Sequence, residues 1–267
     1  MKTLVAIPSK GRAQLFGRRT FKWLQFYRET DTKGLVEWKV FVEPQDFDIY
    51  SKLYGEKRVV KLPENNQGLG YAKECIQKYA LDNGFDAIFK MDDDIARLRH
   101  CQHRSTKKLY DTFDPGEDSL ENSKLIMVEA CVQFERMIQK NPSTVAMSFP
   151  YAKEMWRLEP FTNNKRTQTA YLCLTKWFCP PAGRQVSVFE DFYVYLWYRM
   201  NNKEVVRYNL LGIECDDIGT NAGGHQSDDR KKRALAEAEI LRKMHPALKF
   251  RRVQKPWAIE PDLRSIP

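Results

Sequence analysis

The sequence lacks several features that would assign it at once to a broad class of protein. No run of about 18 apolar residues occurs, so neither a transmembrane helix nor a membrane partner is expected. The apolar run in residues 1–8 is too short for a secretory signal and predicts a first strand. None of the six cysteines forms a CxxC pair, which argues against structural zinc and indicates reduced thiols in a cytoplasmic protein. Neither a GxGxxG fingerprint nor a Walker loop is present, so the sequence supports neither a dinucleotide cofactor nor a P-loop nucleotidase.

Acidic residues are scarce in the two segments where basic residues are concentrated. The chain of 267 residues has a net charge of +9, and residues 230–255 hold ten lysines and arginines against two glutamates. A second basic stretch, residues 97–108, contains five lysines and arginines and no acid. A solvated surface is the ordinary explanation of one charged run, but two separate basic segments favour a polyanionic partner.

Strand-like and helix-like segments alternate through the first half of the chain. Short apolar runs predict strands at residues 2–7, 38–42, 58–62 and 87–91. Helices are expected between them, over residues 14–28, 47–53 and 71–83. This alternation predicts an α/β fold, a single domain with a mostly parallel central sheet and helices on both of its faces.

The second half of the chain is less regular. Residues 97–122 have the composition of a long polar loop, and residues 124–140 of an amphipathic helix that buries Leu125, Val128, Val132 and Ile138. Further strands are predicted at residues 145–149, 171–174 and 204–211, and further helices at 189–200 and 228–244. We expect one domain over residues 1–225, with a nucleotide-binding half (1–96) and an acceptor half (97–225). Residues 226–267 are expected to form a basic C-terminal helix and tail packed on that domain.

Three consecutive aspartates, Asp92, Asp93 and Asp94, directly follow the predicted strand at residues 87–91. Side chains alternate along a strand, so the first and third carboxylates are expected on one side. Like charges at a strand end repel one another unless a cation is present, and a divalent ion with a bound diphosphate is a natural partner. A solvated acidic turn is the alternative. The position at a strand's carboxyl end favours a ligand site, because ligands of open α/β sheets bind there.

Two further loops are expected at the same edge of the sheet. Residues 8–12, with Pro8, Ser9 and Arg12, offer backbone amides, a hydroxyl and a guanidinium that suit phosphate or a uracil edge. Residues 65–70, with Asn66 and Gly68, precede a helix whose N-terminus favours anions and from whose first turn Lys73 would project. Glycines there are also explained by turns alone.

The order of these motifs resembles the nucleotide-sugar-binding half of GT-A glycosyltransferases. The aspartates match the DxD motif, which implies that Asp92 and Asp94 bind a divalent metal, Mn or Mg, and that Asp92 and Asp93 contact the donor diphosphate. The Pro-Ser-x-Gly-Arg opening and the segment 41–44, which contains Glu43, resemble the phage TET-associated glycosyltransferases that modify hydroxymethylated pyrimidines in DNA. The resemblance covers about residues 1–225.

The resemblance also implies roles in the acceptor half. Glu190 and Asp191 resemble the xED motif of inverting GT-A enzymes, which implies that Asp191 is the general base. An acidic pair that stabilises a helix dipole is the alternative. His225 matches the C-terminal histidine that ligates the metal in many GT-A enzymes, although a lone histidine is more often a surface residue. Two further acidic pairs, at residues 216–217 and 228–229, compete for the metal assignment.

The sequence therefore predicts a metal-dependent glycosyltransferase that moves a hexose or a pentose from a UDP-sugar to hydroxymethylated DNA in the cytoplasm, the host's if the chain is phage-encoded. DNA is favoured as the acceptor because basic residues flank the aspartates and fill the C-terminal segment. Trp156, Trp177 and Trp197 are candidates to stack a flipped base, with core packing as the alternative. Other readings are a glycosyltransferase acting on protein, lipid or glycan, a nucleotidyltransferase, and a non-catalytic nucleic-acid-binding module.

Overall fold

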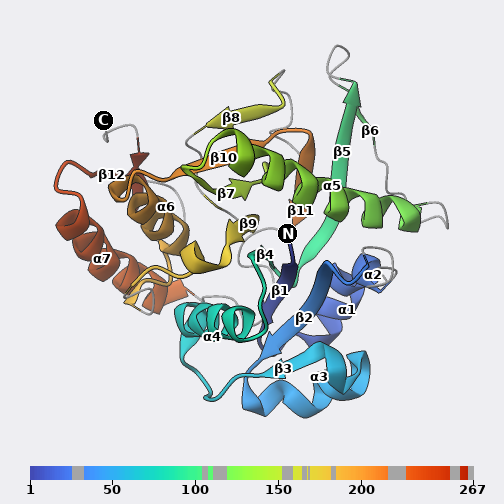
Figure 1. Ribbon diagram of the computed structural model, residues 1–267. Coiled ribbons are helices and arrows are strands. Elements are labelled where there is room, and N and C mark those ends of the chain that lie inside the picture. The colour runs from blue at the N-terminus through green and yellow to red at the C-terminus, as the bar shows by residue number, and fades with distance from the viewer. Residues whose placement is uncertain are drawn as a thin grey trace.

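The fold is described from a computed structural model, which covers residues 1–25, 33–103, 108–110, 119–151, 159–163, 167, 169–181, 185–215, 227–252 and 259–263. In the first half, strands alternate with helices as expected (Figure 1), and the elements are β1 (Thr3–Ser9), α1 (Ala13–Arg18), α2 (Thr20–Leu24), β2 (Val36–Val42), α3 (Phe47–Tyr54), β3 (Val59–Lys61), α4 (Gly68–Asp82) and β4 (Ala87–Met91). The later elements are β5 (Ile95–His103), β6 (Lys108–Tyr110), α5 (Ser119–Lys140), β7 (Thr144–Ser148), β8 (Phe161–Asn163), β9 (Ala170–Leu174), α6 (Glu190–Met200), β10 (Glu204–Tyr208), β11 (Leu211–Cys215), α7 (Ser227–Met244), β12 (Lys249–Arg252) and β13 (Ile259–Asp262).

The central sheet has eight strands in the order β3-β2-β1-β4-β9-β7-β10-β8. The first four are parallel, and β7 and β10 run in the same direction, whereas β9 and β8 are antiparallel to their neighbours. Six of the eight strands therefore point their carboxyl ends to one edge of the sheet. The predicted mostly parallel sheet is confirmed, with β9 as an antiparallel strand between its two parallel parts.

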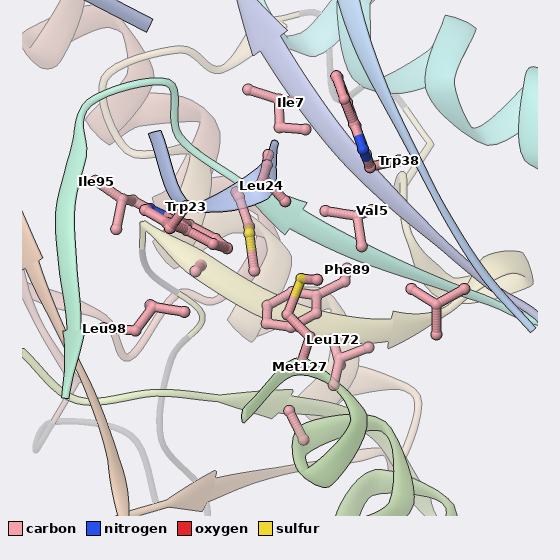
Figure 2. Close-up of a cluster of buried hydrophobic side chains, with 14 of the residues drawn as sticks. Val5, Ile7, Trp23, Leu24, Trp38, Phe89, Ile95, Leu98, Met127 and Leu172 are labelled. Carbon is pink, nitrogen blue, oxygen red and sulfur yellow. The ribbon is translucent and has the colours of Figure 1, made fainter. Parts of the chain in front are cut away.

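Helices cover both faces of this sheet, because the side chains of its inner strands alternate between two apolar layers. Val5 and Ile7 of β1 belong to one cluster, which also contains residues of α1, α2, α3 and α5. Leu4 and Ala6 of the same strand belong to the other cluster, under α4 and α6. Figure 2 shows the first layer, in which Trp23 lies beside Ile95 and Leu98 against the sheet. Both faces are buried, so the inner strands are almost continuously apolar.

Three sequence-based expectations differ from the structure. The polar loop expected over residues 97–122 is wrong in part, since β5 and β6 form a three-stranded sheet with β11. The strand expected over 204–211 is two strands in different sheets, because the chain turns at residues 209–210. Val132 is exposed, and α5 instead buries Ile126, Met127, Ala130 and Phe134.

The C-terminal elements form a third apolar layer on the outer side of α6. Phe189, Phe192 and Leu196 pack there against Ala234, Ala238 and Leu241 of α7 and against Leu248. The antiparallel pair β12 and β13 follows α7 in the chain. Across the ranges given above, no helix combines the length and the hydropathy that crossing a bilayer requires. The cysteines at positions 75, 131, 173, 179 and 215 are free thiols.

Candidate active site

The carboxyl ends of three parallel strands bring the predicted donor residues to one edge of the sheet. Ser9 ends β1, Glu43 follows β2, and Asp92 follows β4. The parallel register of β1 with both neighbours fixes these ends side by side. Such an edge is where open α/β sheets bind their ligands.

Asp93 is the buried centre of this edge, with no exposed surface. Its carboxylate accepts a hydrogen bond from Ser9 Oγ, which is itself 2.5 Å from the Tyr50 hydroxyl. Arg12 Nη2 lies 2.6 Å from Asp93 Oδ1 as an ion pair rather than an aligned hydrogen bond. Burial raises the pKa of Asp93 to about 7, against the opposing effects of Arg12 and Ser9. Asp93 therefore fastens the loop after β1 to the loop after β4.

Asp92 and Asp94 lie on the open side of the same loop, and their side chains are 34% and 21% exposed. Lys90 donates a hydrogen bond to Asp92 Oδ1, and Arg12 Nη1 is 3.5 Å from Asp94 Oδ2. Burial raises the pKa of Asp94, and the charge of Asp92 raises it further. The structure thus separates the buried middle aspartate from two partly exposed carboxylates that repel each other.

Glu43 is a buried carboxylate that ties three loops together. It accepts hydrogen bonds from Lys10 Nζ at 3.0 Å, from the backbone amide of Asn66 at 2.9 Å and from Gln45 Nε2 at 2.9 Å. Lys10 Nζ also lies 2.6 Å from Asn66 Oδ1. These contacts join the loops after β1 and β2 to the loop that leads into α4.

Replacing Glu43 by glutamine is expected to weaken binding of the sugar nucleotide that the sequence motifs predict at this edge by about tenfold, the equivalent of one charge-assisted hydrogen bond. The glutamine side chain keeps one oxygen that can accept a hydrogen bond from the backbone amide of Asn66, but it loses the ion pair with Lys10. The loops at this edge of the sheet are therefore held less firmly. Titration calorimetry with UDP-sugar and Mn²⁺ measures the effect. Glu56→Gln, an exposed position before β3, is the charge-matched control. Equal donor affinity in the two variants would contradict the role of Glu43.

The N-terminus of α4 faces this edge without a side-chain cap. Asn66 and Gly68 adopt left-handed backbone angles, with φ of 61° and 83°, and so turn the chain into the helix. The first backbone amides of a helix have no partner within the helix and favour a negatively charged ligand. The left-handed backbone angle at position 68 therefore explains why this residue is a glycine. An anion can approach the helix at the same point.

Lys73 lies in the second turn of α4, because the helix begins at Gly68, three residues before the expected start. Its side chain is buried, 2% exposed, with Nζ 2.6 Å from the Tyr171 hydroxyl and ion-paired with Glu190. The rings of Tyr171 and Phe178 lie 5.0 and 5.4 Å from the same nitrogen. Lys73 thus connects α4 to the first residue of α6, and its contacts in the structure are to this cluster.

Asp191 occupies the first turn of α6 and is half-buried. The Tyr151 hydroxyl lies 3.0 Å from Thr169 Oγ1, and the Thr169 carbonyl accepts a hydrogen bond from the backbone amide of Asp92 at 3.2 Å. Burial raises the pKa of Tyr151, a hydrogen bond with Thr169 lowers it, and the nearby carboxylates of Asp92 and Asp191 raise it further. The carboxylates of Asp92 and Asp191 are therefore both close enough to the Tyr151 hydroxyl to affect its pKa.

Sequence reasoning missed Lys90, a buried cation in the middle of β4. Burial alone would lower the pKa of Lys90, but the charges of Asp92, Glu190 and Asp94 raise it. Lys90 therefore remains charged between the two acidic motifs. A lysine within the otherwise apolar run 87–91 is the signal that could have identified it. Tyr151, Tyr171 and Thr169 carried no comparable signal.

The remaining predicted residues are placed as follows. Pro8 is a half-buried residue of β1, opposite Phe41 of β2. His225 and the acidic pair 216–217 lie outside the described residues. Within the described ranges, no three His, Cys, Asp or Glu side chains converge in a way that could hold a metal ion.

Comparisons with known proteins show which family the chain is similar to. The model of the family described as TET-Associated Glycosyltransferase matches residues 3–224. Among solved structures, S. aureus TarS 1-349 is 12% identical with a TM-score of 0.48, and the match covers 80% of this chain and 59% of that one. The same TarS fragment in complex with UDP also matches at 12% identity and a TM-score of 0.48, over 90% of this chain and 66% of that one.

A third solved structure, described as a nucleotide-diphospho-sugar transferase from Desulfovibrio desulfuricans G20, is 12% identical with a TM-score of 0.44 and covers 77% of this chain and 79% of that one. No curated protein sequence matches this chain. The family match confirms the resemblance drawn from the sequence motifs and the GT-A-like fold expected from it.

Proposed function

The chain belongs to the TET-associated glycosyltransferase family and is a glycosyltransferase, and we propose that it moves a sugar from a UDP-sugar to a hydroxymethylated pyrimidine base in DNA. The family membership favours this reading over a nucleotidyltransferase and over a non-catalytic nucleic-acid-binding module. Transfer to a protein, a lipid or a glycan is the alternative that keeps the same donor site.

One observation carries the donor half of the proposal. The Arg12 guanidinium, the uncapped N-terminus of α4 and the carboxylates of Asp92 and Asp94 all lie at one edge of the sheet. Positive groups and helix amides suit the phosphates of a nucleotide, while the partly exposed carboxylates suit a cation that bridges to them. We assign the diphosphate to this edge, with Ser9, Glu43 and Asn66 shaping the loops around the nucleoside.

The residues at this edge fit a divalent cation, Mn or Mg. Such ions are often held by one or two carboxylates together with substrate phosphates, so Asp92 and Asp94 suffice without a third protein ligand. Burial raises the pKa of Asp94 and the charge of Asp92 raises it further, and a bound cation would offset the repulsion between the two carboxylates. When bound, the ion would neutralise charge on the departing diphosphate. His225 stays in the proposal as a further ligand.

In the proposed reaction, Asp191 takes the proton from the acceptor hydroxyl as its oxygen attacks the anomeric carbon of the sugar. The new glycosidic bond forms while the bond from that carbon to the diphosphate breaks and UDP leaves. A single displacement of this kind inverts the anomeric configuration. Lys73 holds the carboxylate of Glu190, which leaves Asp191 as the residue of the xED motif to accept the proton.

The C-terminal helix supports DNA as the acceptor. Its inner side packs on α6, and its outer side exposes Lys231, Lys232 and Lys243, while Lys249 and Arg252 are exposed on β12. Exposed cations of this kind bind the phosphates of DNA whatever its base sequence, because each contact releases counterions from the DNA. Trp177 and Trp197 pack against each other with tilted rings whose centroids are 4.9 Å apart, which supports core packing rather than base stacking for this pair.

Mass spectrometry of DNA tests the proposed function directly. Hydroxymethylated and plain DNA are incubated separately with the protein, Mn²⁺ and each of a panel of UDP-sugars. We expect a mass gain of one sugar per modified base on hydroxymethylated DNA alone, together with release of UDP. Transfer to a protein, lipid or glycan with no gain on any DNA would refute the acceptor, and release of pyrophosphate would refute the reaction.

Removing Lys231, Lys232 and Lys243 together by alanine substitution is expected to raise the KM for DNA at least tenfold at about 0.15 M salt. The slope of log affinity against log salt should fall by up to about 2.7, because each lost phosphate contact contributes about 0.9. The donor KM should not change, since these side chains lie on the outer face of α7. Fluorescence anisotropy with labelled duplexes measures the slope.

Alanine substitution of three other exposed lysines, Lys52, Lys78 and Lys176, is the matched control for this prediction. An equal loss of DNA affinity in both triple variants would show that net charge, and not the α7 surface, attracts the DNA.

A further inference from the structure

Helix α7 contains a buried carboxylate that the proposed chemistry does not use. Glu237 is 4% exposed, on a helix whose neighbouring residues 231–233 are exposed and basic. A carboxylate moved out of water is costly unless hydrogen bonds or a cation compensate for the lost hydration. Within the described part of the chain, no lysine or arginine forms an ion pair with Glu237. Its charge must therefore be compensated by other groups.

Four hydrogen bonds from three consecutive residues provide this compensation. Glu237 Oε1 accepts from the backbone amide of Ser187 at 2.8 Å and from its hydroxyl at 2.9 Å. Glu237 Oε2 accepts from the amide of Val188 at 2.8 Å and from the amide of Phe189 at 2.9 Å. Hydrogen bonds to an ionised acceptor are about twice as strong as neutral ones. The carboxylate therefore fixes the backbone of residues 187–189 as a unit.

These three residues lead directly into α6, which begins at Glu190 and carries Asp191 in its first turn. No side chain within this segment caps the helix. On one side the start of α6 is held by Lys73 of α4 through Glu190, and on the other by Glu237 through the preceding amides. The first turn is thus fixed by two charged groups from distant parts of the chain.

We infer that Glu237 is a positioning residue for the transfer reaction, setting where the carboxylate of Asp191 lies relative to the donor. This inference rests on the proposed role of Asp191 as the base. A displacement of about 1 Å at a reacting group can cost about 100-fold in rate, so an anchor one residue from the helix start has a large effect. Glu237 lies beyond residues 3–224, so the anchor comes from outside the matched family region.

Glu237→Ala is expected to lower kcat by about 10- to 100-fold while the KM and the Kd for the UDP-sugar stay within a factor of about two. The donor contacts come from β1, β2, α4 and β4, which Glu237 does not touch. Glu237→Gln keeps the shape and part of the acceptor capacity, so it should restore much of the rate. Kinetics are measured per donor-binding site, well below the melting temperature, so that a loss of folded protein does not count as a loss of rate.

Glu239→Gln is the matched control, because Glu239 lies on the same helix but is exposed and pairs with Arg242. Its rate should equal that of the unaltered protein. Hydrogen exchange is measured in parallel, and Glu237→Ala should speed exchange of the amides of residues 187–193, whereas the control should not.

The outcomes separate the inference from the proposed function. Folded Glu237→Ala protein with unchanged kcat per donor site would overturn the positioning role even if exchange increases. Equal falls in kcat and donor affinity would also overturn it, since they indicate a general structural role. If the unaltered protein transfers no sugar to any acceptor, the proposed function fails, and the exchange data alone then judge whether Glu237 anchors α6.

Discussion

Replacing either Asp92 or Asp94 by asparagine is expected to lower kcat/KM for the UDP-sugar by about 100-fold or more, because each substitution removes a charged oxygen ligand of the proposed cation, which would neutralise the leaving group. The two side chains are the partly exposed carboxylates of the aspartate loop, and the proposal assigns them to the cation. Initial rates over a series of Mn²⁺ concentrations measure the effect. The variants should need more metal to reach half of their maximal rate.

Two controls make this prediction specific. Asp82→Asn removes an exposed carboxylate at the end of α4, paired with Lys78, and should leave the rate unchanged. Asp93→Asn removes the buried contacts with Ser9 and Arg12 and should lower thermal stability together with donor affinity. Unchanged donor kinetics in both the Asp92 and the Asp94 variants would contradict the assignment of the cation to this loop.

Replacing Asp191 by asparagine is expected to lower kcat by about 100- to 10,000-fold, the usual contribution of a general base. Asparagine has nearly the same shape, so the first turn of α6 should keep its structure and the donor should bind with unchanged affinity. Stopped assays of sugar transfer give kcat, and calorimetry gives the donor affinity. A large fall in kcat at constant donor affinity is the signature of a group that acts on the acceptor hydroxyl.

Glu190→Gln is the comparison for this variant, because Glu190 is the neighbouring carboxylate but is ion-paired with the buried Lys73. Its removal leaves a buried lysine without its carboxylate, so we expect a lower melting temperature and a smaller loss of kcat than in Asp191→Asn. If Glu190→Gln abolished transfer while Asp191→Asn did not, the base would be Glu190.

Much of the donor half of the fold follows from local sequence. Buried strands of a parallel sheet are apolar on both faces, so β1, β2 and β4 stand out as continuous apolar runs. Strand β5 carries polar and basic residues, and it pairs with β11, from Leu211 opposite His100 to Cys215 opposite Ile95, far away in the sequence. A short window of sequence around β5 does not contain β11, so the local pattern of this segment predicts a loop.

The candidate site divides in the same way. Ser9, Arg12 and Asp93 were predicted as neighbours because carboxyl ends of parallel strands share an edge, and the structure brings them into contact. Glu237 carried no such signal, since one glutamate on a charged helix has the pattern of a solvated residue. Its burial depends on how α7 packs on α6, which is a tertiary contact that spacing along the chain does not encode.

The packing of α7 on α6 also determines which residues must be kept together for the protein to fold. The family model ends at residue 224, yet Phe189, Phe192 and Leu196 are covered by side chains that come after it. A fragment trimmed to the matched residues would present these rings and aliphatic groups to water as one apolar patch, a surface prone to aggregation. The boundary of the matched family region thus differs from the boundary of the packed apolar core. A relative with another C-terminal segment must cover the same face of α6 by other means.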